Sequence, residues 1–127
     1  MSIITDYLKD LESYLNEIPY RLATKVHVEN RGDVALLIKG EIVFVDESEL
    51  HIKEYFISIP VLQKLAYSYH YQDKNKKLIF RFDNAEHYPD VKTNPHHKHI
   101  KSQILPSKDM SLKAVINEVL NMVGKSE

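Results

Sequence analysis

Two short segments in which every second residue is apolar constrain the fold most. They are YSYHY at 67–71 and LIFRF at 78–82, with the polar stretch QDKNKK between them. Alternation of this kind is typical of a strand with one buried face, and a short polar connection between two such strands predicts a β-hairpin. We therefore expect an antiparallel hairpin whose aromatic side chains all face the core.

The polar turn sets the register expected for this hairpin. A turn closed by Asp73 and Lys76 gives two aromatic pairs, which are Tyr69 with Phe80 and Tyr67 with Phe82. Because side chains on a strand alternate between its two faces, burial of the aromatic face sends the polar side chains to the other face. These are Ser68, His70, Gln72, Arg81 and Asp83. We expect this polar face to form the floor of a functional site.

The rest of the chain predicts helices at both ends and further strands between them. Apolar residues recur at three- and four-residue spacing up to Pro19, and again after Ser111, which is a suitable N-cap. Residues 34–46 are rich in Val, Ile and Leu, and residues 50–56 alternate as a half-buried strand does. The sequence therefore predicts one α+β domain over residues 1–127. It is an antiparallel sheet of four to five strands, flanked by an N-terminal and a C-terminal helix.

Composition excludes several kinds of site. The chain has no cysteine, which rules out disulfides, thiolate zinc sites and a cysteine nucleophile. Its 17 basic and 18 acidic residues nearly balance, so there is no global signature of polyanion binding. No apolar run approaches the roughly twenty residues that span a bilayer, and the N-terminus lacks the pattern of a signal peptide. We expect a cytoplasmic protein.

Histidines are concentrated in one segment. Five of the seven lie between residues 67 and 101: His70, His87, His96, His97 and His99. Histidine changes charge near neutral pH and therefore serves as an acid, a base or a metal ligand. Residues 70–101 also hold seven basic against four acidic residues, which makes a local positive patch. This composition is typical of a reaction site.

The chain over residues 65–123 resembles the TumE-like toxins of bacterial and archaeal toxin–antitoxin pairs. The motifs that carry the resemblance occur in order, as YHYQD, LIFRFDN, AEHYP, PHHKH and SLKAVINEVL. The resemblance implies a small intracellular toxin that acts on RNA and is paired with a helix-turn-helix antitoxin. Tyr88 departs from the family pattern, in which a second histidine is expected between His87 and Pro89.

Cleavage of RNA without a metal needs a base for the 2′-OH, an acid for the leaving 5′-oxygen and a cation for the phosphorane. His97 and His99 are the candidate acid and base, because residues two apart on an extended strand share a face. Arg81 would bind phosphate, and no cofactor is required. The other candidates are Asp83 and His70 to orient an imidazole, His87 for catalysis, and Asn84, His96, Lys98 and Lys101 for substrate binding.

Two other functions stay open. His97, His99, His87 and Asp83 together offer ligands for zinc or another divalent metal, in a nuclease or a zinc-binding module. Alternatively, the histidine face binds RNA or a partner without catalysis. His27 and His51 lie outside the cluster and are expected to be ordinary surface or strand residues. The sequence leaves a homodimer open as well.

Overall fold

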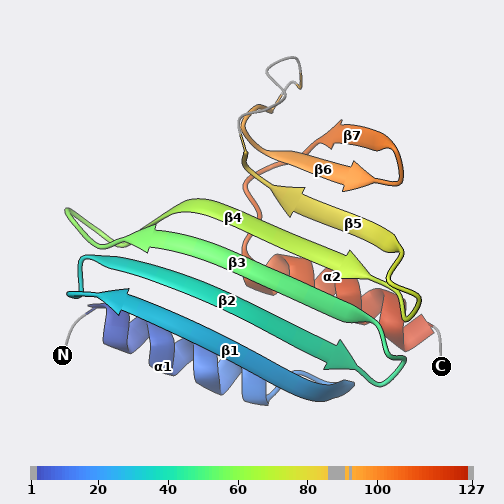
Figure 1. The fold of residues 1–127 in the computed structure, drawn as a ribbon, viewed down its shortest axis with the longest axis horizontal. Coiled ribbons are helices and arrows are strands. Elements are labelled where there is room, and N and C mark those ends of the chain that lie inside the picture. The colour runs from blue at the N-terminus through green and yellow to red at the C-terminus, as the bar shows by residue number, and fades with distance from the viewer. Residues whose placement is uncertain (1–2, 86–90, 92, 126–127) are drawn as a thin grey trace.

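A single antiparallel sheet with both helices on one side makes up the protein (Figure 1). The computed structural model describes residues 3–85, 91 and 93–125. Within these residues the elements are α1 (Ile3–Asn16), β1 (Arg21–Arg31), β2 (Ala35–Phe44), β3 (Glu49–Ile57), β4 (Gln63–Gln72), β5 (Leu78–Asp83), β6 (His97–Ile100), β7 (Gln103–Pro106) and α2 (Leu112–Lys125). The strands pair in chain order, so the sheet is a meander from β1 to β7. Neither helix in the described residues has the length and apolar character needed to cross a membrane.

The predicted α+β class and the two terminal helices are confirmed, but the predicted strand number is wrong. The described residues form seven strands instead of four to five. The signal for β1 is weak because it is an edge strand with exposed side chains at nearly every position, and β7 has only four residues. The predicted cap of α2 is present, since the Ala114 N–H donates to Ser111 Oγ at 3.1 Å.

The predicted hairpin forms, with aromatic pairs that differ from the prediction. Tyr71 lies opposite Phe80 and Tyr69 opposite Phe82. The turn is one residue longer than expected, because the Asp73 N–H donates to the Lys77 carbonyl at 2.9 Å. An irregularity after Tyr71 adds a second one-residue shift. A single shift would have moved the aromatic side chains to the opposite face, whereas two shifts keep them on the core side.

The helix-covered face of the sheet holds the core. Tyr67, Tyr69, Phe80 and Phe82 are all buried there, as predicted. Glu54 on β3 is also buried, and it accepts a hydrogen bond from the Tyr69 hydroxyl at 2.5 Å. A buried carboxylate needs such partners, because removing its charge from water is costly. The covered face therefore positions β3, β4 and β5 firmly against the helices.

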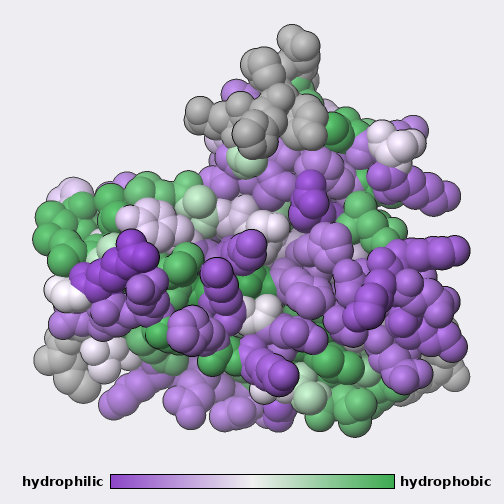
Figure 2. Space-filling view, in the orientation of Figure 1, coloured by the Kyte–Doolittle hydropathy of each residue, from purple (hydrophilic) through white to green (hydrophobic). Residues whose placement is uncertain are grey.

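The opposite, open face carries two rows of polar side chains that cross the sheet. Figure 2 shows this face, where hydrophilic side chains cover much of the surface. Residues paired across neighbouring strands point to the same face, so the register defines the rows. The arginine row runs from β3 to β6 as His51, His70, Arg81 and His99. The lysine row runs from β2 to β6 as Lys39, Lys53, Ser68, Asp83 and His97. The sheet thus gathers side chains that lie far apart in the sequence.

Candidate active site

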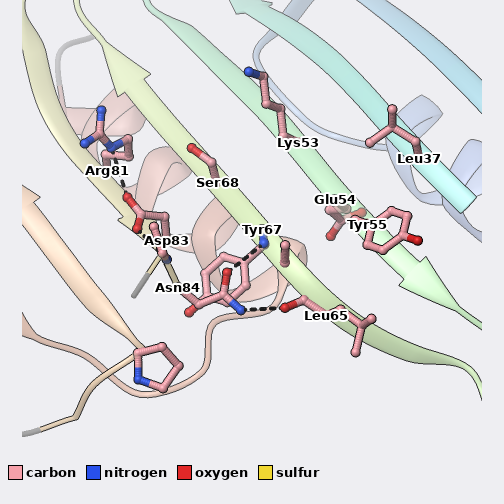
Figure 3. A pocket seen from close by; sticks show the side chains of 13 residues that line it. Leu37, Lys53, Glu54, Tyr55, Leu65, Tyr67, Ser68, Arg81, Asp83 and Asn84 are labelled. Atoms are coloured by element: carbon pink, nitrogen blue, oxygen red, sulfur yellow. Dashed lines mark hydrogen bonds and ion pairs between the residues drawn. The ribbon is translucent and has the colours of Figure 1, made fainter. Parts of the chain in front are cut away.

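A cleft of about 660 Å³ lies on the open face, where the two rows reach β4 and β5 (Figure 3). Arg81 and Asp83 line it at one side, Ser68 and Lys53 lie further across the sheet, and Pro95 closes one end. The pairing of β4 with β5 confirms a prediction, because it places His70, Arg81 and Asp83 on one face. A concave surface with converging polar groups is the usual form of a small-molecule or catalytic site.

Asp83 is the centre of the polar contacts in this site. Its Oδ2 accepts a hydrogen bond from Arg81 Nε at 3.1 Å, and its Oδ1 accepts one from the Ala85 N–H at 3.1 Å. Two histidine nitrogens lie close to the same carboxylate, His97 Nε2 at 2.7 Å from Oδ1 and His99 Nε2 at 3.3 Å from Oδ2. Four nitrogen atoms therefore surround this carboxylate.

His97 is held at the base of the site and is almost inaccessible, with its side chain 1% exposed. Its Nδ1 lies 2.9 Å from the Pro95 carbonyl oxygen, which can only accept, so Nδ1 carries a proton. Its Nε2 faces the Asp83 carboxylate, which also accepts. The ring is thus held at Pro95, with its Nε2 against the Asp83 carboxylate.

His99 lies between two partners of opposite kind. Its Nε2 is 3.2 Å from Nη2 of Arg81, which can only donate, and 3.3 Å from Oδ2 of Asp83, which accepts. Burial and the nearby Arg81 charge lower the pKa of His99 below its ordinary value, although Asp83 opposes the shift. The lowered pKa therefore favours the neutral imidazole of His99 near pH 7.

His70 lies on the other side of Arg81 in the arginine row. Its Nε2 is 3.0 Å from the Gln72 side-chain oxygen, so this nitrogen donates. Burial lowers the pKa of His70, the bond with Gln72 opposes the change, and the Arg81 charge lowers the pKa further. Since neighbouring strands are about 4.8 Å apart, Arg81 stands between two imidazoles that lie one strand away on either side.

Of the predicted site residues, Arg81, Asp83 and Asn84 line the cleft, and the histidines paired with Arg81 lie beside it on the same face. The Asn84 amide group bonds the main chain of β4, at Tyr67 N and Leu65 O. His96 stacks on Tyr67 and contacts its hydroxyl at 2.8 Å. Lys98 lies over the rings of Phe80 and Phe82.

Lys101 and His87 are the remaining predicted site residues. Lys101 is exposed in the turn after β6 and has a positive φ of 53°. His87, with the neighbouring Tyr88, falls outside the described residues.

The sequence interpretation missed the part of the site contributed by β3. His51 lies opposite His70, with ring centroids 6.1 Å apart, and Lys53 lies opposite Ser68 at the cleft. The alternation over residues 50–56 already placed His51 and Lys53 on a polar face. It did not show that β3 pairs with β4, because strand pairing is not encoded in periodicity.

The site also offers a donor set for a metal ion. One ligand atom each from Asp83, His97 and His99 lies within 4.8 Å of the other two. The bond from His97 Nδ1 to a carbonyl is of the kind that orients metal-binding histidines. The Arg81 guanidinium is unfavourable for a cation here, because its Nη2 lies 3.2 Å from the His99 nitrogen that would ligate the ion.

Comparison with known proteins identifies the family. The family model described as toxin TumE matches residues 11–126, which is most of the chain and includes the N-terminal half that carries no recognisable motif. Searches among curated proteins and among solved structures found no match. The chain belongs to the TumE toxin family.

Proposed function

We propose that this toxin cleaves RNA by metal-independent acid–base chemistry at the arginine row. The observation that carries the proposal is the order His70, Arg81, His99 across three neighbouring strands on the open face. A phosphate bound to Arg81 would have an imidazole on each side. Displacement at phosphorus needs that arrangement, since the attacking and leaving oxygens lie on opposite sides of the phosphorus.

The contacts and pKa shifts favour a role for each group. The lowered pKa of His99 favours a neutral ring with a lone pair, so His99 would remove the proton of the 2′-OH, and the 2′-oxygen would then form its bond to phosphorus. Arg81 would stabilise the charge of the phosphorane. His70, when protonated, would give a proton to the 5′-oxygen as the phosphorus–oxygen bond breaks. The products are a 2′,3′-cyclic phosphate and a 5′-hydroxyl.

Asp83 and His97 support this row from the neighbouring row, two residues along the strands on the same face. Asp83 holds Arg81 through Nε, and His97 holds Asp83 while remaining almost fully buried. The sequence predicts His97 and His99 as the acid and base. Burial favours His70 as the partner of His99, because a ring that is 1% exposed has little access to a leaving oxygen. His97 then acts as a positioning residue.

A cleavage assay with purified protein tests this function. The wild type should cut a single-stranded RNA in EDTA, whereas the His99→Ala, Arg81→Ala and His70→Ala variants should lose activity and toxicity. Binding of RNA without any turnover would leave the toxin as a non-enzymatic binder.

The metal-dependent alternative rests on the Asp83, His97 and His99 donor set. It requires the ion to displace or tolerate the Arg81 guanidinium. Loss of activity in EDTA, restored by zinc or another divalent ion, would support this alternative. Stoichiometric zinc in the purified protein, measured by elemental analysis, would do the same.

The partner that we propose is a helix-turn-helix antitoxin that covers the open face in the cytoplasm. The proposal rests on membership of a toxin family and on the excess of basic residues over 70–101, which suits an acidic partner segment. Co-expression with the product of the adjacent gene should relieve toxicity and yield a complex on purification. Undiminished toxicity and no complex would contradict the proposal.

We also propose that two copies pair through β1. Among the described strands, β1 is at the edge of the sheet, and its Leu22, Val26 and Val28 side chains are exposed. An antiparallel pairing centred on His27 places Lys25 of each copy opposite Glu29 of the other, which satisfies the self-complementarity of a twofold interface.

Charge reversal tests this dimer. Lys25→Glu and Glu29→Lys should each weaken it, and mixing the two variants should restore it as a heterodimer, as seen by sedimentation. A monomeric wild type at all concentrations would contradict the proposal.

A further inference from the structure

Three hollows on the open face share walls and form one groove across the sheet. The active-site cleft and a second hollow of about 480 Å³ are both lined by Lys53 and Ser68. The second hollow and a third of about 270 Å³ are both lined by Lys39, Gly40 and His51. The three hollows therefore follow one another across the sheet, from Arg81 and Asp83 on β5 to the edge strand β1.

The lysine row supplies positive charge along this groove. Lys39 and Lys53 are exposed, and they are paired directly across β2 and β3. With neighbouring strands about 4.8 Å apart, Lys53 lies roughly 10 Å and Lys39 roughly 14 Å from the position of Asp83. The next residues along the row are Ser68 and then Asp83 itself. A phosphate chain can thus pass from the active site over a hydroxyl to two ammonium groups.

An aromatic shelf lies beside the lysines. Tyr55 pairs with Leu37 on one side and Ala66 on the other, and all three line the cleft (Figure 3). This shelf is two residues along the strands from the lysine row, on the same face. Lysines on one side and a half-buried aromatic ring at the surface on the other are the features that single-stranded nucleic-acid sites combine.

Acidic residues bound the groove on its other side. Glu41 pairs with His51 across β2 and β3, and Glu49 lies 3.0 Å from His51 Nε2. Glu49 also lies 3.7 Å from Lys76 Nζ. These carboxylates repel a polyanion, so they favour a path along the lysine row and the Tyr55 side of the groove.

We propose that single-stranded RNA crosses the open face along the lysine row, with its phosphates on Lys53 and Lys39 and a base stacked on Tyr55. This inference rests on the proposed ribonuclease function and adds the path of the substrate beyond the reacting phosphate. The substrate-binding surface is thereby placed on β2 and β3, away from Lys98 and His96, which lie against aromatic rings of the core face.

Binding to a non-cleaving protein tests the path separately from the chemistry. A fluorescent single-stranded RNA of about twelve nucleotides is titrated with the His99→Ala protein at several salt concentrations. Adding Lys39→Ala and Lys53→Ala together should weaken binding about tenfold. It should also reduce the slope of log K against log salt by about 0.7 for each lysine. Adding Tyr55→Ala should weaken binding by about tenfold or more while leaving the salt slope unchanged.

The matched control is Lys113→Ala, which removes the same charge from α2 on the covered side of the sheet, where Lys113 lies over Tyr14. This change should leave RNA affinity and salt slope as they were. The path is overturned if the wild type cleaves RNA while the Lys39→Ala/Lys53→Ala protein binds it as tightly as its parent. The path is also overturned if the Lys39→Ala/Lys53→Ala protein loses only antitoxin binding, because that result would assign the groove to a protein partner. A wild type that neither binds nor cleaves RNA would overturn both the path and the proposed function.

Discussion

The two faces of the sheet differ in composition, because one holds the core and the other holds the polar site. On the face covered by the helices, alternate residues of β2 to β5 are apolar or aromatic and almost fully buried. On the open face, histidine, lysine, arginine, serine and aspartate side chains form the two polar rows. The polar residues there are positioned by the packing of their neighbours, because a strand that buries one face has no freedom in where the other face points.

The comparison also shows how ionisable groups are handled on each side. On the covered face, Glu54 is bound by Tyr69 and Tyr7 hydroxyls at 2.5 and 3.3 Å. On the open face, Asp83 forms an ion pair with Arg81 and lies 2.7 Å from His97 Nε2, at the wall of a cleft. The first arrangement satisfies a buried charge and ties α1 to the sheet. The second leaves charged donors next to a space that a substrate can enter.

The largest predicted effect compares two histidines of the same short segment. His99→Ala should lower the RNA cleavage rate by about 10²- to 10⁴-fold, because it removes the general base. His96→Ala is the matched control, since His96 stacks on Tyr67 on the covered side. It should lower the rate far less than His99→Ala. Equal losses of kcat/KM in the two variants, with both proteins folded, would remove the distinction between the faces.

The next effect concerns stability. Phe82→Ala should lower the free energy of unfolding by about 3–5 kcal/mol, because it leaves a cavity in the buried face. Ser68→Ala, one strand away on the open face, should change it by less than about 0.5 kcal/mol. Denaturant titration measures both. A Ser68→Ala protein as unstable as Phe82→Ala would mean that the open face is part of the core.

The value of kcat/KM should be highest at acidic pH. Burial lowers the pKa of both His70 and His99 below the ordinary value of 6.5. Activity falls on the acid side as His99 gains a proton and on the alkaline side as His70 loses one, so the bell should be centred below pH 6.5. Each limb changes the rate about tenfold per pH unit beyond its pKa. A maximum clearly above pH 7 would show that these two groups are not the acid and base.

The smallest predicted effect is that of removing Lys98, which is compared with removal of Arg81 on the neighbouring strand. Arg81 faces the cleft, whereas Lys98 lies 4.8 Å from the centroid of the Phe82 ring. Lys98→Ala should cost about 0.5–1 kcal/mol of stability through the lost cation–π contact and leave cleavage nearly unchanged. A loss of cleavage comparable with that of Arg81→Ala would place Lys98 in the substrate path after all.

Much of this division between faces could be predicted from periodicity. The aromatic alternation of β4 and β5 determines which side chains face the core, and Arg81, Asp83 and His70 follow on the other face. The exact pairs could not be predicted, because the turn at Asp73 and the irregularity after Tyr71 each shift the register by one residue. The two shifts cancel in their effect on the faces, so the predicted face is correct although the predicted pairs are wrong.

The contribution of β3 to the site could not be predicted from the sequence, for a different reason. His51 and Lys53 join the site through pairing of β3 with β4, and a sequence contains no local signal for which strands become neighbours. The edge strand β1 was missed because its exposed side chains give no burial pattern. Local periodicity therefore predicts which face a residue occupies, but it does not predict which strands adjoin.

The chemical ends of the RNA products test the central claim most directly. RNA cut in EDTA by the purified wild type should carry 2′,3′-cyclic phosphate and 5′-hydroxyl ends. A substrate with a 2′-deoxy residue at the cleavage site should bind and stay intact, because His99 would have no 2′-OH to deprotonate. Products with 5′-phosphate ends, or cleavage of the 2′-deoxy substrate, would contradict acid–base attack by the 2′-oxygen at the arginine row.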